Sequence, residues 1–365
     1  MITLEEAKVG MTNKVDQAVI DEFRRGSLLL DRLIFDNAVS PGTAGSTLGY
    51  SYVKLLTPST AAFRKLNTEY TGNEAKREKA SAELKIFGGE FALDRVIINT
   101  SGAVDELEFQ MQEKIKAAIN LFHHTVINGN STTNEDEFDG LDKLVAGSTT
   151  EYNQNYTLTA DTALVDGKTY YTRSGSGTKA SPYKYTKVAS PVVGSIATYY
   201  ELSTIDLSSS KAMDDNYNVF LDMMDEFIST MEGKPDMFLV NRTTKTKMKG
   251  IARRAGYYSR TEDAFGRSID NWDGIPFVDL EEYYNGTDTV PCVHIDDNGM
   301  TSIYAIQIAK DGFHGVSPTG NNIISTALPD LKAPGVIKKG DVEMVAAVVL
   351  KNTRKAGAFR NIKIK

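Results

Sequence analysis

Two adjacent histidines, His123 and His124, are the first candidates for acid–base chemistry or for holding a metal ion in this chain of 365 residues. Neighbouring residues on a helix point about 100° apart, so these two cannot share a ligand in the way that residues one turn apart do. We therefore expect one of the two to face the core and the other to face solvent.

The sequence patterns of the familiar enzyme classes are absent. The chain has no Gly-rich phosphate loop followed by Lys-Ser/Thr, no paired-glycine dinucleotide turn, no nucleophile elbow and no His-Glu-x-x-His zinc helix. We predict that the protein is not an enzyme and has no catalytic residues, no cofactor-binding residues and no metal ligands.

Two acidic stretches contain the residue types that bind metal ions. Glu135, Asp136, Glu137 and Asp139 gather before a glycine, but their spacing does not fit the helix-loop-helix calcium pattern and favours a solvated acidic loop. The stretch 296–299, Asp-Asp-Asn-Gly, has the composition of a hairpin turn, with metal binding as the second interpretation.

Basic residues gather in two places. The run from Lys245 to Arg254 could contact phosphate, but no aromatic residues interleave to stack bases, which favours a solvated or subunit-contacting face. After Glu343 no acidic residue follows, which indicates acidic neighbours from another subunit or from a polyanion, or else a solvated edge. The basic residues of this closing segment are Lys351, Arg354, Lys355, Arg360, Lys363 and Lys365.

Net charge and cysteine content restrict the partners and the redox environment that we expect for the protein. The net charge of -7 argues against a surface built to wrap DNA, although it does not exclude lining a compartment that holds nucleic acid. The single cysteine, Cys292, leaves no disulfide framework and suits a reducing cytoplasm or a setting indifferent to redox. Without a signal peptide or a long apolar run, we expect a soluble, unsecreted protein.

The longest helical pattern in the sequence covers residues 103–128, and we call it the spine helix. Its apolar residues recur at spacings of three and four, as in Ile115, Ile119, Phe122 and Val126, and form one continuous stripe. At about 1.5 Å per residue the helix is ~40 Å long. We predict that Gly129 ends it in a left-handed conformation.

Before the spine helix the pattern predicts short helices within residues 1–26 and an apolar arm at 27–39, which must lie on its own domain or on a neighbouring subunit. Alternating runs at 48–56 and 82–98 predict a long two-stranded extension with a charged tip. Gly88 and Gly89 predict a bulge or bend in its return strand.

After the spine helix the composition changes. Residues 151–202 are dominated by Tyr, Thr, Ser, Gly and Val, and two phrases within them end alike in Tyr-Tyr, which indicates a small inserted β-rich module. Helices alternating with strands follow from about residue 206, and the chain closes with a strand buried on both faces and a basic strand.

This order of parts resembles the major capsid proteins of tailed double-stranded DNA bacteriophages, with the Hong Kong ninety-seven-like fold. The local phrases that carry the resemblance are SLLLDRLIF at 27–35, FALDRVIINTSG at 91–102, FDGLDKLVAGS at 138–148 and VVLKNTRKAGAFRNIKI at 348–364. The resemblance implies an α+β capsid fold whose parts are an N-terminal arm (1–47), an extended two-stranded loop (48–98), a peripheral domain with the spine helix (99–150), an inserted small β-rich domain (151–205), an axial domain (206–320) and a return to the peripheral domain (321–365).

The function that the resemblance implies is self-assembly into hexamers and pentamers that form an icosahedral head shell around the genome. Implied partners are other copies of the chain, packaged double-stranded DNA on the inner face, a separate scaffolding protein, a portal and a possible decoration protein, with no membrane. The location would be the virion, after assembly in the host cytoplasm. The residues expected at subunit interfaces are Arg64, Lys65, Lys76, Arg77, Lys79, Arg354, Lys355 and Arg360.

Some members of this family cross-link subunits through a lysine in the extended loop and an asparagine in the closing segment, assisted by a carboxylate. Here Lys65, Lys76 or Lys79 could supply the first group and Asn352 the second, but no acidic residue follows in the closing strand. We therefore predict no autocatalytic cross-link.

Three other functions stay open. An encapsulin-like compartment that stores a cargo enzyme would use the same fold, although the β-rich insertion favours a phage shell. A tail or baseplate protein would suit the β-rich phrases, but the spine helix argues against it. An enzyme of unfamiliar type lacks any visible pairing of a nucleophile with a base.

Overall fold

The structure is a computed structural model. It describes most of the chain, except for the first 26 residues and most of the β-rich insertion. The helices predicted within residues 1–26 lie outside the described residues. The described residues are 27–38, 47–57, 59–70, 72–100, 106–152, 156–157, 170–174, 184–190, 198–199, 205–256, 259–262, 268–296, 299–318, 324–330 and 332–365.

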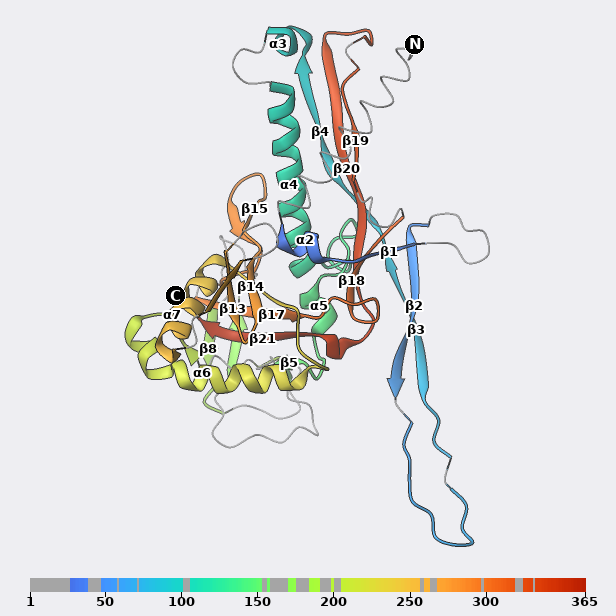
Figure 1. The fold of residues 1–365 in the computed structure, drawn as a ribbon, viewed down its shortest axis with the longest axis vertical. Helices are drawn as coiled ribbons and strands as arrows, with labels where there is room; N and C mark the ends of the chain where they lie inside the picture. Colours follow the sequence, from blue (N-terminus) through green and yellow to red (C-terminus); the bar gives the residue numbers. More distant parts are fainter. Residues whose placement is uncertain are drawn as a thin grey trace.

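The spine helix is confirmed as α4, Glu106–Asn128, and it lies along a sheet whose long strands are β4 and β20 (Figure 1). Its predicted apolar stripe is buried, with Ile115, Phe122 and Val126 at 1% exposure or less. The Phe122 ring lies 6.0 Å from Phe87 and 5.9 Å from Phe138, measured between ring centroids. The stripe therefore forms the centre of the largest core.

The sheet beside the spine helix has the strand order β1-β18-β20-β19. Strand β18 pairs with residues 347–350 of β20, and β4 pairs with the preceding residues 337–346. The antiparallel register of β4 with β20 runs without a break from Asp94 opposite Ile337 to Lys85 opposite Ala346. The strands are β1 (Phe35–Asn37), β4 (Lys85–Asp94), β18 (Phe313–Ser317), β19 (Ile324–Ala327) and β20 (Ile337–Leu350).

Two glycine predictions need correction. Gly129 does not have a positive φ, and glycine is needed there because a Cβ atom would lie 2.2 Å from the carbonyl oxygen of Phe138. Gly88 makes no bulge, since the ladder is unbroken, but its φ is 153° and a Cβ atom there would lie 2.0 Å from the Val342 carbonyl oxygen. Both positions require glycine because another backbone segment approaches closely.

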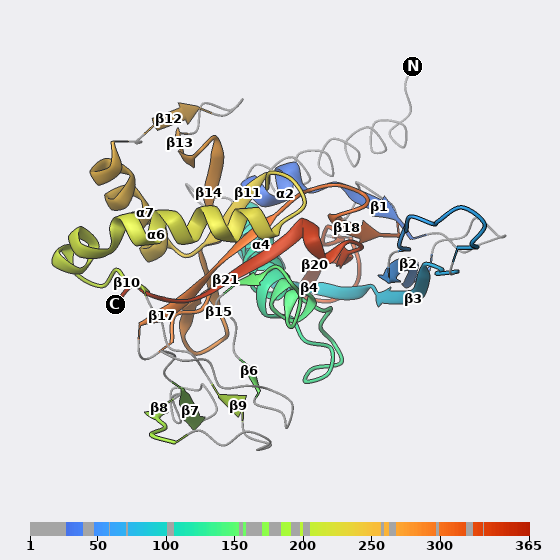
Figure 2. The ribbon, with the colours of Figure 1, turned by 90° about the horizontal axis from the view of Figure 1, so that it is seen from below.

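A second, mixed sheet packs between the spine core and the helices α6 (Ser210–Thr230) and α7 (Arg242–Ala255). Figure 2 shows α6 lying across this sheet. Its strand order is β10-β21-β17-β11-β14-β13-β12, with β5 beside β21. The strands are β5 (Glu151–Tyr152), β10 (Ile205–Asp206), β11 (Met237–Val240), β12 (Ser259–Glu262), β13 (Ser268–Trp272), β14 (Ile275–Asp279), β17 (Met300–Ile306) and β21 (Ala356–Lys363).

The alternation of side chains along β11 explains how this sheet joins two cores. Phe238 and Val240 belong to the core under the helices, whereas Met237 and Leu239 belong to the spine core. The resemblance implies that residues 321–365 return to the peripheral domain with the spine helix, but the last strand, β21, lies in this mixed sheet rather than in the sheet beside the spine helix.

The apolar arm packs on its own chain. Helix α2 (Leu28–Arg32) and strand β1 bury Leu29, Leu30 and Phe35 in the spine core, and β1 pairs in parallel with β18. Ser27 caps α2 by accepting from the Leu30 N–H. The arm therefore finds within the same subunit the surface that it needs.

His123 ties the arm to the spine helix. The Nδ1 atom lies 3.1 Å from the Leu280 carbonyl oxygen and donates to it, so Nε2 accepts from the Ser27 hydroxyl at 2.6 Å. Burial lowers the pKa of His123 to about 4, which keeps it neutral. His123 is core-facing as expected, but His124 is half-buried against the Tyr283 ring rather than fully solvated.

The remaining elements are short. No helix among the described residues is long and apolar enough to span a bilayer. In the inserted segment the described parts are paired strands, seen at the bottom of Figure 2. These elements are α3 (Arg95–Thr100), α5 (Leu141–Val145), η1 (Thr353–Lys355), β6 (Tyr156–Thr157) with β9 (Thr198–Tyr199), β7 (Tyr171–Ser174) with β8 (Lys184–Lys187), and β15 (Glu282–Tyr284) with β16 (Thr289–Pro291).

Replacing Phe122 with alanine should lower the free energy of unfolding of the unassembled subunit by about 3–5 kcal/mol, because the cavity would lie at the centre of the core. Phe109→Ala is the matched control on the same helix, since Phe109 is 46% exposed, and it should cost less than about 1 kcal/mol. Denaturant unfolding followed by circular dichroism measures both, and equal losses would contradict the assignment of the buried face.

Candidate assembly surfaces

A two-stranded hairpin, residues 49–83, extends away from both sheets (Figure 1). Strand β2 (Gly49–Thr57) pairs with β3 (Lys76–Glu83), with a register shift between Leu55 and Thr57. The predicted return strand is thus partly wrong: β3 begins within the stretch expected to be the charged tip. The following strand, β4, pairs with β20 instead.

The tip of the hairpin exposes large apolar side chains to solvent. Phe63 is 107% exposed, Leu66 87% and Tyr70 64%. The Arg64 guanidinium lies 5.5 Å from the centroid of the Tyr70 ring, within range of a cation–π contact. In an isolated subunit the apolar and cationic side chains of the tip are therefore exposed to solvent. Sequence reasoning missed these apolar residues, although they stand out in the polar stretch 57–81.

The hairpin brings together the first group of predicted interface residues. All of them are exposed, at the tip or on β3, and in the described structure they face solvent. Their role at an interface stays a prediction. The residues are Arg64, Lys65, Lys76, Arg77 and Lys79.

The root of the hairpin is held by Tyr50, at the start of β2. Its hydroxyl donates to Asp36 at 3.0 Å, and Lys310 lies 3.4 Å from the same carboxylate. Burial and the bond to Asp36 raise the pKa of Tyr50 to about 12. For Asp36, burial acts to raise the pKa, but the Tyr50 bond and the Lys310 charge together lower it.

Two further side chains pack on the Tyr50 ring. His314 meets it edge-on at 6.1 Å between centroids, and the Lys351 ammonium lies 5.1 Å from its centroid. His314 is fully buried; burial lowers its pKa, and its Nε2 has no hydrogen-bond partner among the described residues. These contacts fix the angle at which the hairpin leaves the body.

A second exposed apolar surface lies at the far end of the β4–β20 ladder, next to α3 (Figure 1). Its residues come from α3, from the start of β20 and from the loop before β20. They are Val96, Leu328, Val336 and Ile337, exposed by 62%, 45%, 58% and 60%.

Three basic residues of the closing segment, Lys355, Arg360 and Lys363, have acidic partners within the same chain. Arg360 lies between Asp142 and Glu151, and its side chain is only 13% exposed. Lys355 pairs with Asp311 at 2.6 Å. For Lys355, Arg360 and Lys363 this corrects the expectation that the acids come from another subunit or a polyanion. The interface role of Arg354, Lys355 and Arg360 stays a prediction.

The Arg360 cluster joins four elements. Asp142 of α5 also accepts from the hydroxyl of buried Tyr304 at 2.7 Å, while Glu151 begins β5 at the entry to the insertion. Burial acts to lower the pKa of Arg360, but the charges of its acidic neighbours raise it. The cluster therefore fixes α5, β5, β17 and β21 against one another.

The acidic loop after the spine helix is ordered by its own hydrogen bonds. Asp139 accepts from the Ser131 N–H and hydroxyl and from Lys143, at 2.7–2.9 Å. Among the described residues no group of three or more His, Cys, Asp and Glu side chains is placed to hold a metal ion. In the stretch 296–299, the Gly299 N–H donates to the Asp296 carbonyl, as in a turn.

No acidic residue follows Asn352 in the closing strand, but the fold brings a carboxylate to it from elsewhere in the chain. The Asn352 side-chain amide donates to Glu232, which follows α6, at 2.9 Å. A carboxylate works best as a general base in a buried setting, whereas Glu232 is exposed. The absence of a cross-link therefore stays a prediction, and its reason is now the solvent exposure of Glu232.

No family model and no curated protein matches the chain. A search of solved structures finds the same fold: the encapsulin of the holo-SrpI complex from Synechococcus elongatus has a TM-score of 0.52 at 12% identity, over 92% of this chain and 87% of that one. The chain has the Hong Kong ninety-seven-like fold. Two further similar structures are a protein of Mycobacterium phage Bobi (TM-score 0.49, 10% identity, 91% of this chain and 89% of that one) and the capsid of the native GTA particle (0.45, 11%, 92% and 89%).

In the Hong Kong ninety-seven-like fold that the sequence resembles, the hairpin stands where the extended loop is expected, and α4 is the spine helix. Helices α6 and α7 and the strands β11 to β14 and β17 fall within the range predicted for the axial domain, whereas β5 and β21 of the same sheet come from outside that range. The domain boundaries themselves stay predictions.

Replacing Arg360 with glutamine should lower the free energy of unfolding by about 2–4 kcal/mol, because Glu151 would stay buried without its cation. Lys363→Gln is the matched control: its ion pair with Asp206 spans 3.6 Å between side chains that are 41% and 42% exposed, so its loss should stay within about 0.5 kcal/mol. Denaturant unfolding of the unassembled subunits compares them. A neutral Arg360→Gln variant would show that the cluster does not hold these elements together.

Assembled particles should dissociate into single chains on a denaturing gel, because the carboxylate beside Asn352 is solvated. A ladder of covalent oligomers would contradict this prediction. If such a ladder disappeared in Glu232→Gln, it would assign the catalytic carboxylate to Glu232.

Proposed function

We propose that this protein is the major capsid protein of a tailed double-stranded DNA phage, which assembles into hexamers and pentamers of an icosahedral head shell. The fold shared with an encapsulin shell supports a shell-forming role. The phrases quoted above and the β-rich insertion favour a phage head within that group.

The observation that carries the proposal is the hairpin with its uncovered tip. A two-stranded hairpin is marginal when isolated, and this one holds Phe63, Leu66 and Tyr70 in solvent. Full burial of a large apolar side chain contributes about 1.5–3 kcal/mol. Covering the tip on another copy would therefore supply part of the free energy of assembly, with the far end of the β4–β20 ladder as a second contact.

The other components of the proposal follow from this role. The protein would act without catalysis, in the virion, after assembly in the host cytoplasm. Its inner face would meet packaged DNA, and a scaffolding protein, a portal and a decoration protein would be its further partners. The β-rich insertion would form an additional domain on the shell.

An encapsulin-like compartment is the second candidate, and the likeness to an encapsulin subunit favours it specifically. Such a shell would enclose a cargo protein instead of a genome. The two candidates share the subunit fold and differ in contents and in size.

The chain purified alone, and then with the products of neighbouring genes, should form capsomer rings or closed shells by electron microscopy and light scattering. Nuclease-protected double-stranded DNA inside shells from infected cells would support the phage head, whereas a protein cargo would support the compartment. A stable monomer under every condition would contradict both candidates.

A further inference from the structure

Two short strands, β5 and β10, flank the inserted segment and pair with the same edge of β21. Tyr152 of β5 lies opposite Phe359, and Ile205 of β10 lies opposite Ile362. Both strands run parallel to β21, whose other edge is occupied by β17 along this stretch. The two strands therefore lie end to end along one edge of the sheet, although the sequence 153–204 separates them.

The gap between β5 and β10 has the length of one residue. On the other edge of β21, the residues of β17 opposite Phe359 and Ile362 are separated by Ser302 alone. Strand β21 takes one residue more than β17 over this stretch, and Asn361, with a φ of 60°, marks the bulge. An edge strand beside the same stretch would also need one residue in the gap, where this chain has residues 153–204.

The faces on which the flanking side chains lie agree with this spacing. Ile205 belongs to the core under α6 and α7, and Tyr152 packs against the same core. Side chains alternate between the two faces of a strand, so residues that share a face are separated by one residue or another odd number. A joint of one residue therefore keeps both side chains on this face, whereas a direct joint would turn one of them away.

Both ends of the gap are anchored to the body of the subunit. The Tyr152 hydroxyl donates to Glu226 of α6 at 2.5 Å. Ile205 is 1% exposed, and the Asn216 side-chain amide donates to the Asp206 carbonyl oxygen at 3.0 Å. The described strands inside the insertion pair with one another and with no described strand of the two sheets. The ends are thus held by contacts with the body.

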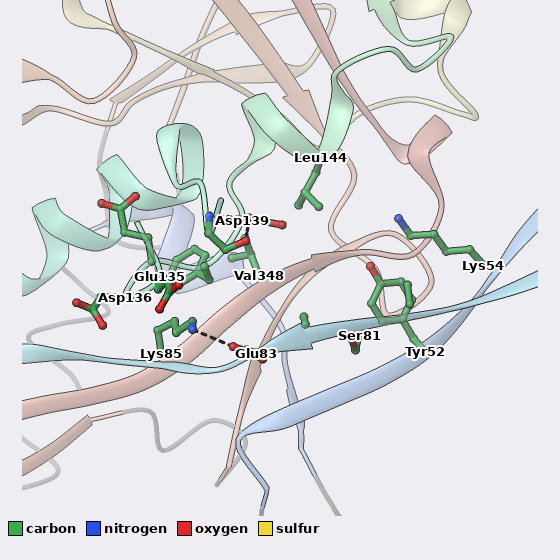
Figure 3. A pocket seen from close by; sticks show the side chains of 15 residues that line it. Tyr52, Lys54, Ser81, Glu83, Lys85, Glu135, Asp136, Asp139, Leu144 and Val348 are labelled. Carbon is green, nitrogen blue, oxygen red and sulfur yellow. Dashed lines mark hydrogen bonds and ion pairs between the residues drawn. The ribbon is translucent and has the colours of Figure 1, made fainter. Parts of the chain in front are cut away.

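The surfaces proposed for assembly lie on other elements. At the root of the hairpin a cleft of about 720 Å³ opens between the hairpin, with Tyr52 and Lys54, and the acidic loop, with Asp136 (Figure 3). None of the residues that line this cleft comes from β5, β10 or β21. The hairpin tip and the far end of the β4–β20 ladder are also formed by other segments. Removing the insertion would leave these surfaces unchanged.

We propose that β5 and β10 are the two halves of one edge strand, and that the rest of the subunit folds and assembles without the residues between them. The insertion is then an added module whose role is separate from shell formation. The part of this inference that concerns assembly rests on the proposed function, whereas the part that concerns folding does not.

Two deletions that differ by one residue test the joint. Deleting residues 153–203 joins Tyr152 to Ile205 through Thr204 and should complete the edge strand. The matched control deletes residues 153–204 and joins Tyr152 directly to Ile205. Adjacent Cα atoms are about 3.8 Å apart, whereas two steps along a strand span ~6.6 Å, so the direct joint should pull Ile205 out of the core.

Tryptophan fluorescence measures the result, because Trp272 is the only tryptophan in the sequence and lies in β13 of the same sheet. In urea the one-residue joint should unfold at the midpoint of the natural chain, and the direct joint should unfold at a midpoint lower by about 1 M or more. A one-residue joint that is as unstable as the direct joint would overturn the proposal of a single interrupted strand.

A third variant separates the need for the insertion from the length of the joint. It replaces residues 153–203 with a flexible Gly/Ser linker of about twelve residues, which leaves β5 and β10 free to pair as they do in the natural chain. This variant should also unfold at the natural midpoint. Its aggregation or early unfolding would show that the body needs the insertion in order to fold, which contradicts the proposal.

Electron microscopy compares assembly. The variant with the one-residue joint should form the same rings or shells as the natural chain. If it folds like the natural chain but stays monomeric while the natural chain assembles, the insertion takes part in shell formation and this inference is overturned. If the natural chain itself forms no assembly, the proposed function fails, and the fluorescence result still decides whether the body folds without the insertion.

Discussion

The structure depends on burial of the apolar stripe of α4. Phe122 sits where the arm, the β4–β20 sheet and the loop after the helix meet, through its contacts with Phe35, Phe87 and Phe138. Strand β20, near the C-terminal end of the sequence, contributes its buried residues to the same core. His123 adds a hydrogen bond to Ser27 of the arm. Because these segments all pack on one helix, the centre of the core around Phe122 forms without the outer part of the hairpin.

That independence explains why the hairpin is available for assembly. The hairpin contributes Tyr50, Tyr52 and Ala82, all near its root, to the margin of the core, so its outer part is stabilised by strand pairing. The root, in contrast, is fixed by the contacts of Tyr50 with Asp36, His314 and Lys351. A rigid root and an uncovered tip together make an arm that can reach a defined place on a second copy.

The sequence predicts well those features that depend on local periodicity. The spine helix and α6 follow from apolar spacing alone, and the apolar run predicts the second half of β20, which is buried on both faces. Strand pairing was harder to predict from the sequence. The start of β3 carries the charged residues Lys76 to Lys79, whose composition is typical of a loop. Strand β4 pairs with β20, which lies about 250 residues further along the chain. The acidic partners of Arg360 were also invisible, because Asp142 and Glu151 lie more than 200 residues before it. The arm at 27–38 was recognised as needing a surface, but only tertiary packing shows that the surface is its own subunit.

A side-chain-resolution reconstruction of a closed particle by cryo-electron microscopy tests the central claim most directly. Our account predicts that every hairpin crosses to an adjacent subunit and that Phe63 and Leu66 are covered there. A closed particle in which the hairpin tip stays in solvent or folds back on its own subunit would contradict it.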